Sequence, residues 1–242
     1  MNIGDVTIGE CPVICASIKG KDPDEILRKV DMANLSDIIE IRLDGFPISV
    51  SESKRMLRSI KQRTDKPILI TNRMEAEGGT FAGSEQERIN IIKEVSLFAD
   101  AIDIELRTEE RQRKEIIEIC KERRKTAIIS YHDMLTSHSV EEISLIFHRM
   151  AETGANIAKV AVLANTLEDV LNLLMATLQT KSTLSIPLVS IPLGEKWKFA
   201  RLCSVLFGSS ILYCSVDELS KTAPGQLTVE DAFEILKRLG LR

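Results

Sequence analysis

The stretch that decides the fold is Asn156-Ile157-Ala158-Lys159-Val160-Ala161-Val162, in which one lysine stands inside a short apolar run. Such a run is typical of a parallel strand that is covered on both faces. Side chains alternate between the faces of a strand, so Lys159 shares one face with Ile157 and Ala161. Burial disfavours the ammonium and favours the neutral amine, a nucleophile that attacks ketones. A lysine on an edge strand, or one that reaches solvent, is the competing interpretation.

The composition is that of a globular protein with a sizeable core. Hydrophobic residues make up 44% and charged residues 28% of the 242 positions, and both values are ordinary. The formal net charge is −4 with basic residues spread among acidic ones, which argues against a nucleic-acid or anionic-membrane surface. Aromatic residues are only 4%, too few for a base-stacking platform. We therefore expect a small-molecule substrate as the partner, with no nucleic acid and no membrane.

The cysteines and the N-terminus indicate a reduced, cytoplasmic protein. The five cysteines are odd in number and no pair is spaced as C-x-x-C; they are Cys11, Cys15, Cys120, Cys203 and Cys214. This pattern favours reduced core residues over disulfides or a zinc or redox site. No signal peptide follows Met1, and no apolar run reaches the length that spans a membrane.

Eight short apolar runs recur along the chain, each followed by an amphipathic segment. Their starts lie 24 to 34 residues apart, the length of one strand-loop-helix-loop unit. The runs are Val13–Ser17, Ile38–Asp44, Pro67–Arg73, Ala101–Leu106, Thr126–Asp133, Ile157–Val162, Pro187–Leu193 and Ile211–Ser215. No linker interrupts them, so residues 1–242 are expected to form a single α/β domain, a (β/α)₈ or TIM barrel. A doubly wound open sheet is the alternative, but the first turn, Ala16–Gly20, lacks the glycine-rich pattern that such a sheet shows.

Local signals mark the ends of these units. Capping boxes predict helix starts at Ser84 and Ser139. Thr166 and Thr228, each with an aspartate three residues later, predict two more helix starts. The segment Val6–Glu10 is expected to form a small hairpin that closes the bottom of the barrel.

Polar side chains alternate with apolar ones on several of the predicted strands. One side of a barrel strand faces the helices and the other faces the interior, so every second residue points inward or to the rim. The inward set is Glu40, Arg42, Asp44, Arg73, Asp103, Glu105, Ser130, His132 and Lys159. Charges inside a barrel are costly unless they are paired, so this set predicts a polar active site at the C-terminal ends of the strands.

A lysine amine beside a histidine suits imine chemistry. The amine attacks a ketone, the histidine removes a proton from the adjacent carbon, and the imine serves as electron sink. No metal-ligand motif is present in the sequence, so neither a metal nor an organic cofactor is expected. Arginines at the barrel mouth suggest a carboxylate substrate. The ten-residue segment Asp217–Gln226 is long enough to serve as a lid.

These residues resemble the type I 3-dehydroquinate dehydratases, Schiff-base lyases of the shikimate pathway. The most specific segments are Glu40–Asp44, Arg73 with Glu77-Gly78-Gly79, Ser130–Asp133, Lys159 placed 27 residues after His132, Arg201 and Ala223–Gln226. The resemblance covers nearly the whole chain. It implies dehydration of 3-dehydroquinate to 3-dehydroshikimate, the third step toward chorismate and the aromatic amino acids. It also suggests a homodimer, since members of the family are often dimers.

The resemblance implies a role for each site residue. Lys159 forms the imine, His132 is the acid-base group, and Glu77 orients His132. The residues implied to bind the substrate are Glu40, Arg42, Arg73, Arg201, Thr222 and Gln226. Among these, Arg201 binds the carboxylate, Thr222 and Gln226 belong to the closing loop, and the other three hold ring hydroxyls. Thr222 stands where the family usually has serine, and Ile191 and Leu193 stand where it usually has methionines.

Two other functions remain open at this point. A class I aldolase or transaldolase-like barrel shares the lysine, but it predicts a phosphate site that the sequence does not show after the seventh strand. A degenerate barrel that binds a small carboxylic acid without catalysis predicts a broken triad, whereas Glu77, His132 and Lys159 are all present.

Overall fold

The eight apolar runs form eight parallel strands that wrap around a common axis. The computed structural model describes residues 1–242. The strands are β3 (Val13–Ile18), β4 (Ile38–Arg42), β5 (Ile68–Thr71), β6 (Ala101–Glu105), β7 (Thr126–Asp133), β8 (Ile157–Leu163), β9 (Leu188–Leu193) and β10 (Ile211–Cys214). They pair in the order β10-β3-β4-β5-β6-β7-β8-β9, and a single bridge from Leu188 to Ser209 joins the remaining seam. The predicted (β/α)₈ barrel is therefore confirmed.

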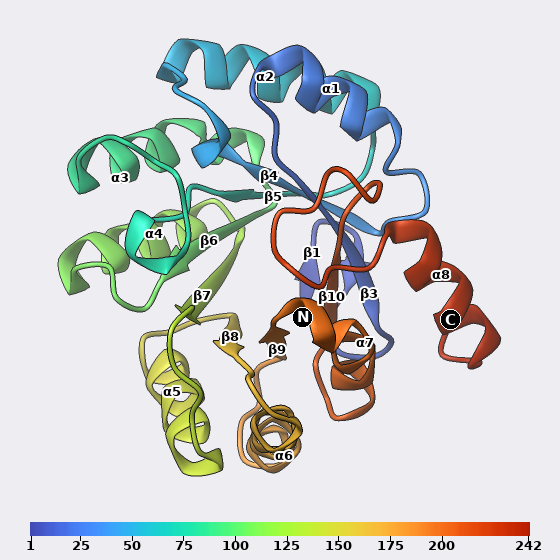
Figure 1. Cartoon of the computed structure of the whole chain (residues 1–242). Helices are drawn as coiled ribbons and strands as arrows, with labels where there is room; N and C mark the ends of the chain where they lie inside the picture. Colours follow the sequence, from blue (N-terminus) through green and yellow to red (C-terminus); the bar gives the residue numbers. More distant parts are fainter.

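Eight α-helices alternate with the strands and surround the barrel (Figure 1). They are α1 (Pro23–Asp31), α2 (Val50–Arg63), α3 (Glu85–Val95), α4 (Glu110–Glu122), α5 (Val140–Glu152), α6 (Leu167–Lys181), α7 (Lys198–Leu206) and α8 (Val229–Arg238). Single 3₁₀ turns lie at Leu43–Gly45, Glu75–Glu77, Ser96–Phe98 and Glu195–Trp197. No helix is long and apolar enough to cross a membrane.

All four helix starts predicted from capping signals are confirmed. Ser84, Ser139 and Thr166 each form a capping box with the residue three positions later, and Thr228 accepts a hydrogen bond from the backbone of Asp231. Side-chain caps satisfy backbone N–H groups that have no partner inside the helix. These caps fix where each helix begins after a loop at the top of the barrel.

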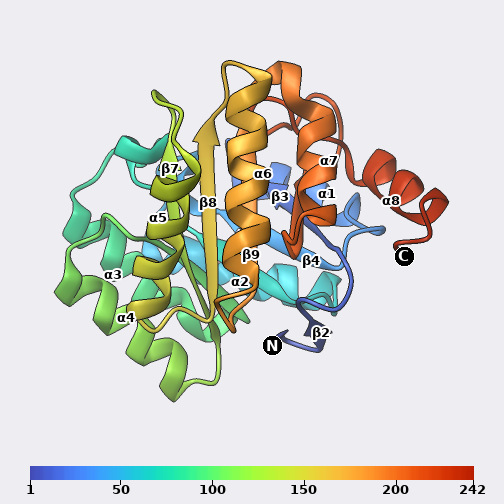
Figure 2. The same cartoon turned by 90° about the horizontal axis from the view of Figure 1, so that it is seen from below.

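A hairpin of β1 (Asn2–Ile3) and β2 (Val6–Thr7) precedes the barrel. Figure 2 places it at the end of the barrel opposite to the tip of β8. The predicted hairpin is thus present, but it starts earlier than the predicted segment Val6–Glu10. Its turn contains Gly4 at a φ of 59°, a conformation that glycine adopts without steric cost. Ile3 and Ile8 are buried and plug the barrel bottom together with interior residues such as Val13.

The barrel interior changes from apolar to polar along the strands. The lower inward layer is apolar and consists of Cys15, Ile38, Leu69, Ala101, Ile128 and Ile157. Two positions further along each strand, toward its C-terminal end, the inward residues are polar and also buried; in the same order they are Ser17, Glu40, Thr71, Asp103, Ser130 and Lys159. The apolar lower layer contributes to stability, and the polar layer above it forms the floor of a site. Strand alternation predicts this change because the period of two is fixed by the backbone.

Two predicted strands end sooner than their apolar runs. Asp44 lies in the 3₁₀ turn after β4, and Arg73 lies beyond the end of β5. The backbone N–H of Arg73 donates to Asp44 Oδ1 at 3.3 Å, which ties the two strand ends together. Both residues therefore belong to the upper rim of the barrel.

Asp44 gives a testable contribution to stability. Two Arg42 nitrogens donate to its carboxylate at 2.8 Å each. Although burial opposes ionisation, this guanidinium lowers the pKa of Asp44 to about 2. The native state thus binds the proton less tightly than the unfolded chain, so the carboxylate stabilises the fold above its unfolded pKa and this contribution is lost as the pH falls from roughly 4 to 2.

We expect Asp44→Asn to lower the free energy of unfolding at pH 7 by on the order of 2–4 kcal/mol, because Arg42 loses its buried partner. The variant should also lose less stability than the wild type between pH 4 and pH 2. Urea unfolding at several pH values measures both effects. Parallel pH profiles for the two proteins would contradict this account of Asp44.

Candidate active site

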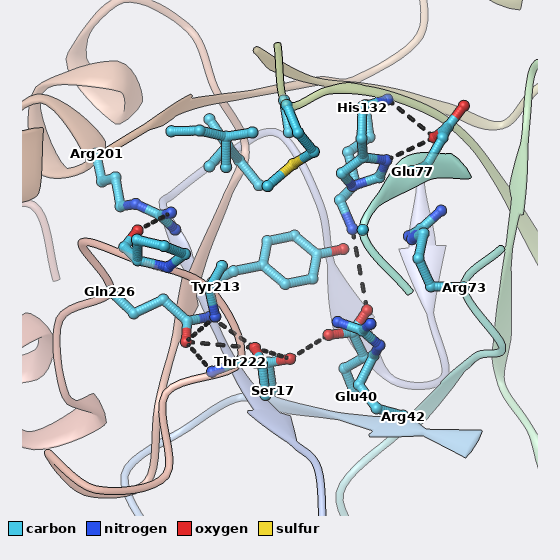
Figure 3. Close-up of a pocket in the computed structure, with 18 residues that line it drawn as sticks. Ser17, Glu40, Arg42, Arg73, Glu77, His132, Arg201, Tyr213, Thr222 and Gln226 are labelled. Carbon is cyan, nitrogen blue, oxygen red and sulfur yellow. Dashed lines mark hydrogen bonds and ion pairs between the residues drawn. The ribbon is translucent and has the colours of Figure 1, made fainter. Parts of the chain in front are cut away.

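A cavity of about 190 Å³ opens at the C-terminal ends of the strands. It is shown in Figure 3. The residues predicted from the sequence all line it: Lys159, His132, Glu77, Glu40, Arg42, Arg73, Arg201, Thr222 and Gln226. They come from β4, β7, β8, α7 and two loops, so the fold brings together side chains from six separate parts of the chain.

Lys159 lies on an interior strand and is only 3% exposed, which rules out an edge-strand lysine. Its Nζ lies 3.0 Å from Asp103 Oδ2 and 3.9 Å from Glu40 Oε1. The sequence-based expectation of a neutral amine considered burial alone. The structure adds the two carboxylates of Asp103 and Glu40 to the surroundings of this amine.

His132 and Glu77 form a hydrogen-bonded pair at the rim. Glu77 Oε2 lies 2.9 Å from His132 Nδ1 and also accepts the backbone N–H of His132 at 2.9 Å. Burial, reinforced by the charges of Arg73 and Lys159, holds the pKa of His132 well below its usual range. Burial likewise raises the pKa of Glu77 to about 8, although Arg73 opposes this. A neutral imidazole with Nδ1 occupied leaves Nε2 free to take a proton from a ligand.

The three arginines of the site differ in their partners. Arg42 is paired with Asp44. Arg73 donates to Glu105 at 2.9 Å and to Ser130 at 2.7 Å, and it also pairs with Asp103. Their positive charges are thus balanced within the protein.

Arg201 is 2% exposed, and its one hydrogen bond is to the backbone oxygen of Pro224 at 2.6 Å. Its Nε has no partner, and burial lowers the pKa of Arg201 to about 10, which keeps the group charged at neutral pH. A buried guanidinium without a carboxylate partner is set to receive one from a ligand.

The loop between β10 and α8 crosses the mouth of the barrel (red in Figure 1). It is hydrogen-bonded to residues inside the barrel. Gln226 Oε1 accepts the backbone N–H of Thr222 at 2.7 Å, and Gln226 Nε2 donates to Thr222 Oγ1 at 3.0 Å. Thr222 donates in turn to Ser17 at 2.9 Å, and Ser17 donates to Glu40. This chain of hydrogen bonds holds the loop closed over the cavity, and the hydroxyl of Thr222 fills the place where the resembling family usually has serine.

Three further residues belong to the site but were not among the predicted site residues. Ser17 and Tyr213 line the cavity, and Asp103 carries the ion pair to Lys159. All three occupy inward positions of their strands, so the period of two could have found Ser17 and Tyr213, and it did place Asp103 inward. The His, Cys, Asp and Glu side chains form no group of three or more that could hold a metal ion.

The comparisons with known proteins agree with this geometry. Residues 14–242 match the family model described as type I 3-dehydroquinase. A 3-dehydroquinate dehydratase of Methanococcoides burtonii is 37% identical over 96% of this chain and 96% of its own length.

Two solved structures are similar over nearly the whole chain. The type I 3-dehydroquinate dehydratase of Clostridium difficile, solved with covalently modified comenic acid, is 31% identical with a TM-score of 0.92, covering 99% of this chain and 96% of its own. The 3-dehydroquinate dehydratase of Geobacillus kaustophilus is 29% identical with a TM-score of 0.89, covering 98% and 99%.

Proposed function

Since the chain belongs to the type I 3-dehydroquinase family, we propose how its barrel dehydrates 3-dehydroquinate to 3-dehydroshikimate in the shikimate pathway. The observation that carries the proposal is one buried cavity that holds Lys159, the His132–Glu77 pair and an arginine without a carboxylate partner. Family membership sets aside the aldolase or transaldolase interpretation. The intact set of Glu77, His132 and Lys159 gives no support to a barrel without catalysis.

Lys159 is the nucleophile. Its neutral amine adds to the ketone carbon of the substrate, the C=O pair moves to oxygen, and a proton moves from nitrogen to oxygen, giving a carbinolamine. A further proton from solvent lets this hydroxyl leave as water, which gives the protonated imine. The carboxylates of Asp103 and Glu40, which lie 3.0 and 3.9 Å from Lys159 Nζ, stabilise the positive charge of the protonated imine.

His132 is the acid-base group. Its neutral imidazole removes the proton on the carbon next to the imine, and the imine nitrogen takes up the electron pair. The same proton assists departure of the hydroxyl on the following carbon as water, which leaves a conjugated double bond. Glu77 orients the ring through Nδ1, and in its ionised form it stabilises the imidazolium that forms, as carboxylate-histidine pairs do elsewhere. Hydrolysis of the imine then regenerates Lys159.

The remaining cavity residues bind the substrate. Arg201 pairs with the substrate carboxylate, and Thr222 and Gln226 hold the loop above it. Glu40, Arg42 and Arg73 surround the ring hydroxyls from the opposite side of the cavity. Figure 3 shows Arg201 and Gln226 on one side and Arg73 with His132 on the other, so the carboxylate and the reacting ketone occupy opposite ends.

A direct assay tests the reaction. Adding 3-dehydroquinate should cause a rise in near-ultraviolet absorbance, because the product is conjugated. Dialysis against EDTA should leave the rate unchanged, since every step uses protein side chains. Activity that is lost on dialysis and restored by zinc or magnesium would refute the proposed mechanism.

Arg201→Ala should weaken substrate capture more than it weakens imine chemistry. Losing a charge-assisted hydrogen bond to a buried carboxylate costs on the order of 2–5 kcal/mol, so KM should rise by roughly 30-fold or more. Steady-state kinetics on Arg201→Ala and on the control Arg111→Ala, an exposed arginine of α4 that does not line the cavity, measure the effect. A KM equal to that of the wild type would show that the carboxylate binds elsewhere.

We further propose that residues 1–242 act as a single catalytic domain, in the cytoplasm and as a homodimer. Three cysteines are buried and unpaired, as is typical of a reducing compartment.

Helix α6 exposes Leu167, Leu171, Met175 and Leu178, an apolar stripe at helical spacing that a second copy would cover. Sedimentation over a range of protein concentrations tests the dimer, and Leu171→Lys should shift it toward the monomer.

A further inference from the structure

Tyr213 on β10 is a buried residue of the cavity that the proposed steps do not use. Its side chain is 5% exposed, yet its hydroxyl has no hydrogen-bond partner. A buried hydroxyl without a partner costs on the order of 1–3 kcal/mol, and a phenylalanine of the same shape would avoid that cost. Buried tyrosines usually find a partner. An orphan phenol that lines a substrate cavity therefore indicates that the partner is the ligand.

The tyrosine lies next to the nucleophile. Lys159 Nζ is 4.1 Å from the centre of the Tyr213 ring, so the amine lies over the ring face. Figure 3 shows the ring extending across the cavity from the side of Arg201 and Gln226 toward that of His132 and Arg73, with its hydroxyl at the far end. The hydroxyl is thus directed to the end of the cavity where the reacting ketone binds.

The two carboxylates whose charges act on this hydroxyl already accept hydrogen bonds from other groups. Glu40 accepts from Ser17 and Thr71, and Asp103 accepts from Ser130 and Lys159. Burial, together with the negative charges of these two carboxylates, holds the pKa of Tyr213 well above its usual range. The phenol therefore keeps its proton, and its hydroxyl is free to donate a hydrogen bond to an incoming oxygen.

We propose that the Tyr213 hydroxyl donates a hydrogen bond to the oxygen of the ketone that Lys159 attacks. When the amine forms the C–N bond, the C=O electron pair moves onto this oxygen, and a proton from the attacking nitrogen turns it into the hydroxyl of the carbinolamine. A further proton from solvent lets this hydroxyl leave as water. Tyr213 keeps its own proton throughout, and its hydrogen bond stabilises the negative charge that develops on the oxygen. The assignment rests on the proposed function, because it requires the imine on Lys159.

Tyr213→Phe removes only the hydroxyl and keeps the ring under Lys159. We expect the rate of imine formation to fall by about tenfold or more. Such a fall is larger than the few-fold effect of losing an ordinary hydrogen bond and smaller than the roughly 10²–10³-fold effect of losing an oxyanion-hole donor. The melting temperature should stay the same or rise, since a buried unpaired hydroxyl is lost. The chain has one other tyrosine, Tyr131, which donates toward Asp133 outside the cavity, and Tyr131→Phe is the matched control.

The experiment follows adduct formation in a single turnover. Enzyme in excess is mixed with 3-dehydroquinate, quenched with borohydride at successive times and analysed by intact mass. Slower trapping in Tyr213→Phe than in the wild type and in Tyr131→Phe, at an undiminished melting temperature, is the expected result. Trapping within twofold of the wild type would overturn the assignment, as would a clear fall in melting temperature, because that would mean that the hydroxyl is bonded within the protein. Absence of any adduct in the wild type would instead refute the proposed function.

Discussion

Lys159→Ala is expected to abolish both the covalent adduct and the dehydration of 3-dehydroquinate. The cavity contains one lysine, so no other primary amine can attack the ketone. Removing a catalytic nucleophile costs roughly 10⁵–10⁶-fold in turnover in well-studied enzymes, and we expect a loss of that order. The rise in near-ultraviolet absorbance and the intact mass after borohydride treatment measure the two effects.

Two companion variants separate chemistry from folding. Lys159→Met keeps the length of the side chain, and Arg73 still pairs with Asp103 in its absence, so circular dichroism and thermal melting should show a folded barrel. Lys198→Ala removes a lysine on α7 that is outside the cavity and should leave activity and adduct intact. Residual dehydration in a folded Lys159→Met protein above a few per cent of wild type would contradict the imine mechanism.

His132→Ala is expected to separate the covalent step from the proton transfers. Lys159 remains, so the variant should still form an imine that borohydride can trap. Turnover should fall by roughly 10²–10⁴-fold for each acid-base step that the histidine serves, and the adduct should persist for longer than in the wild type. Steady-state rates and the time course of trapped mass measure this difference.

His148→Ala is the matched control, because His148 is on α5 and bonds only to Thr183 at the outer surface. It should behave as the wild type. If His132→Ala turned over substrate within tenfold of the wild type, the proton would have to be removed by another group, and Glu77 would be the first to consider.

The barrel and its floor could be predicted from the sequence because strand geometry is periodic. Once Ile157–Val162 is taken as a barrel strand, the period of two fixes Lys159 inward, and the same argument places Glu40 and His132 on their own strands. Capping residues such as Ser84 fixed the helix starts for an equally local reason.

Loop residues could not be derived in this way. Glu77, Thr222 and Gln226 follow no period. Loop length indicated the segment that contains Thr222 and Gln226, but only the resemblance to a family singled out these three residues. Arg201 is on a helix, but nothing in its spacing shows that it turns toward the barrel mouth. Their positions depend on hydrogen bonds between distant segments, such as the contact of Thr222 with Ser17.

The ion-pair partners of the charged side chains were also harder to predict from the sequence than the positions of these side chains in the barrel. Arg73 was expected to hold a substrate hydroxyl, and the structure shows that Asp103 and Glu105 occupy much of its guanidinium. Lys159 was expected to be neutral on grounds of burial, and the structure adds the carboxylate of Asp103 at 3.0 Å. Pairing of charges depends on which strands become neighbours, and a single strand does not carry that information.

Lys159 is expected to form the covalent intermediate. Wild-type protein incubated with 3-dehydroquinate and borohydride, then digested and mapped by mass spectrometry, tests it most directly. We expect one stable mass increment, located on the peptide that contains Lys159 and absent when borohydride or substrate is left out. An increment on Lys181, Lys196 or Lys198 instead would contradict it.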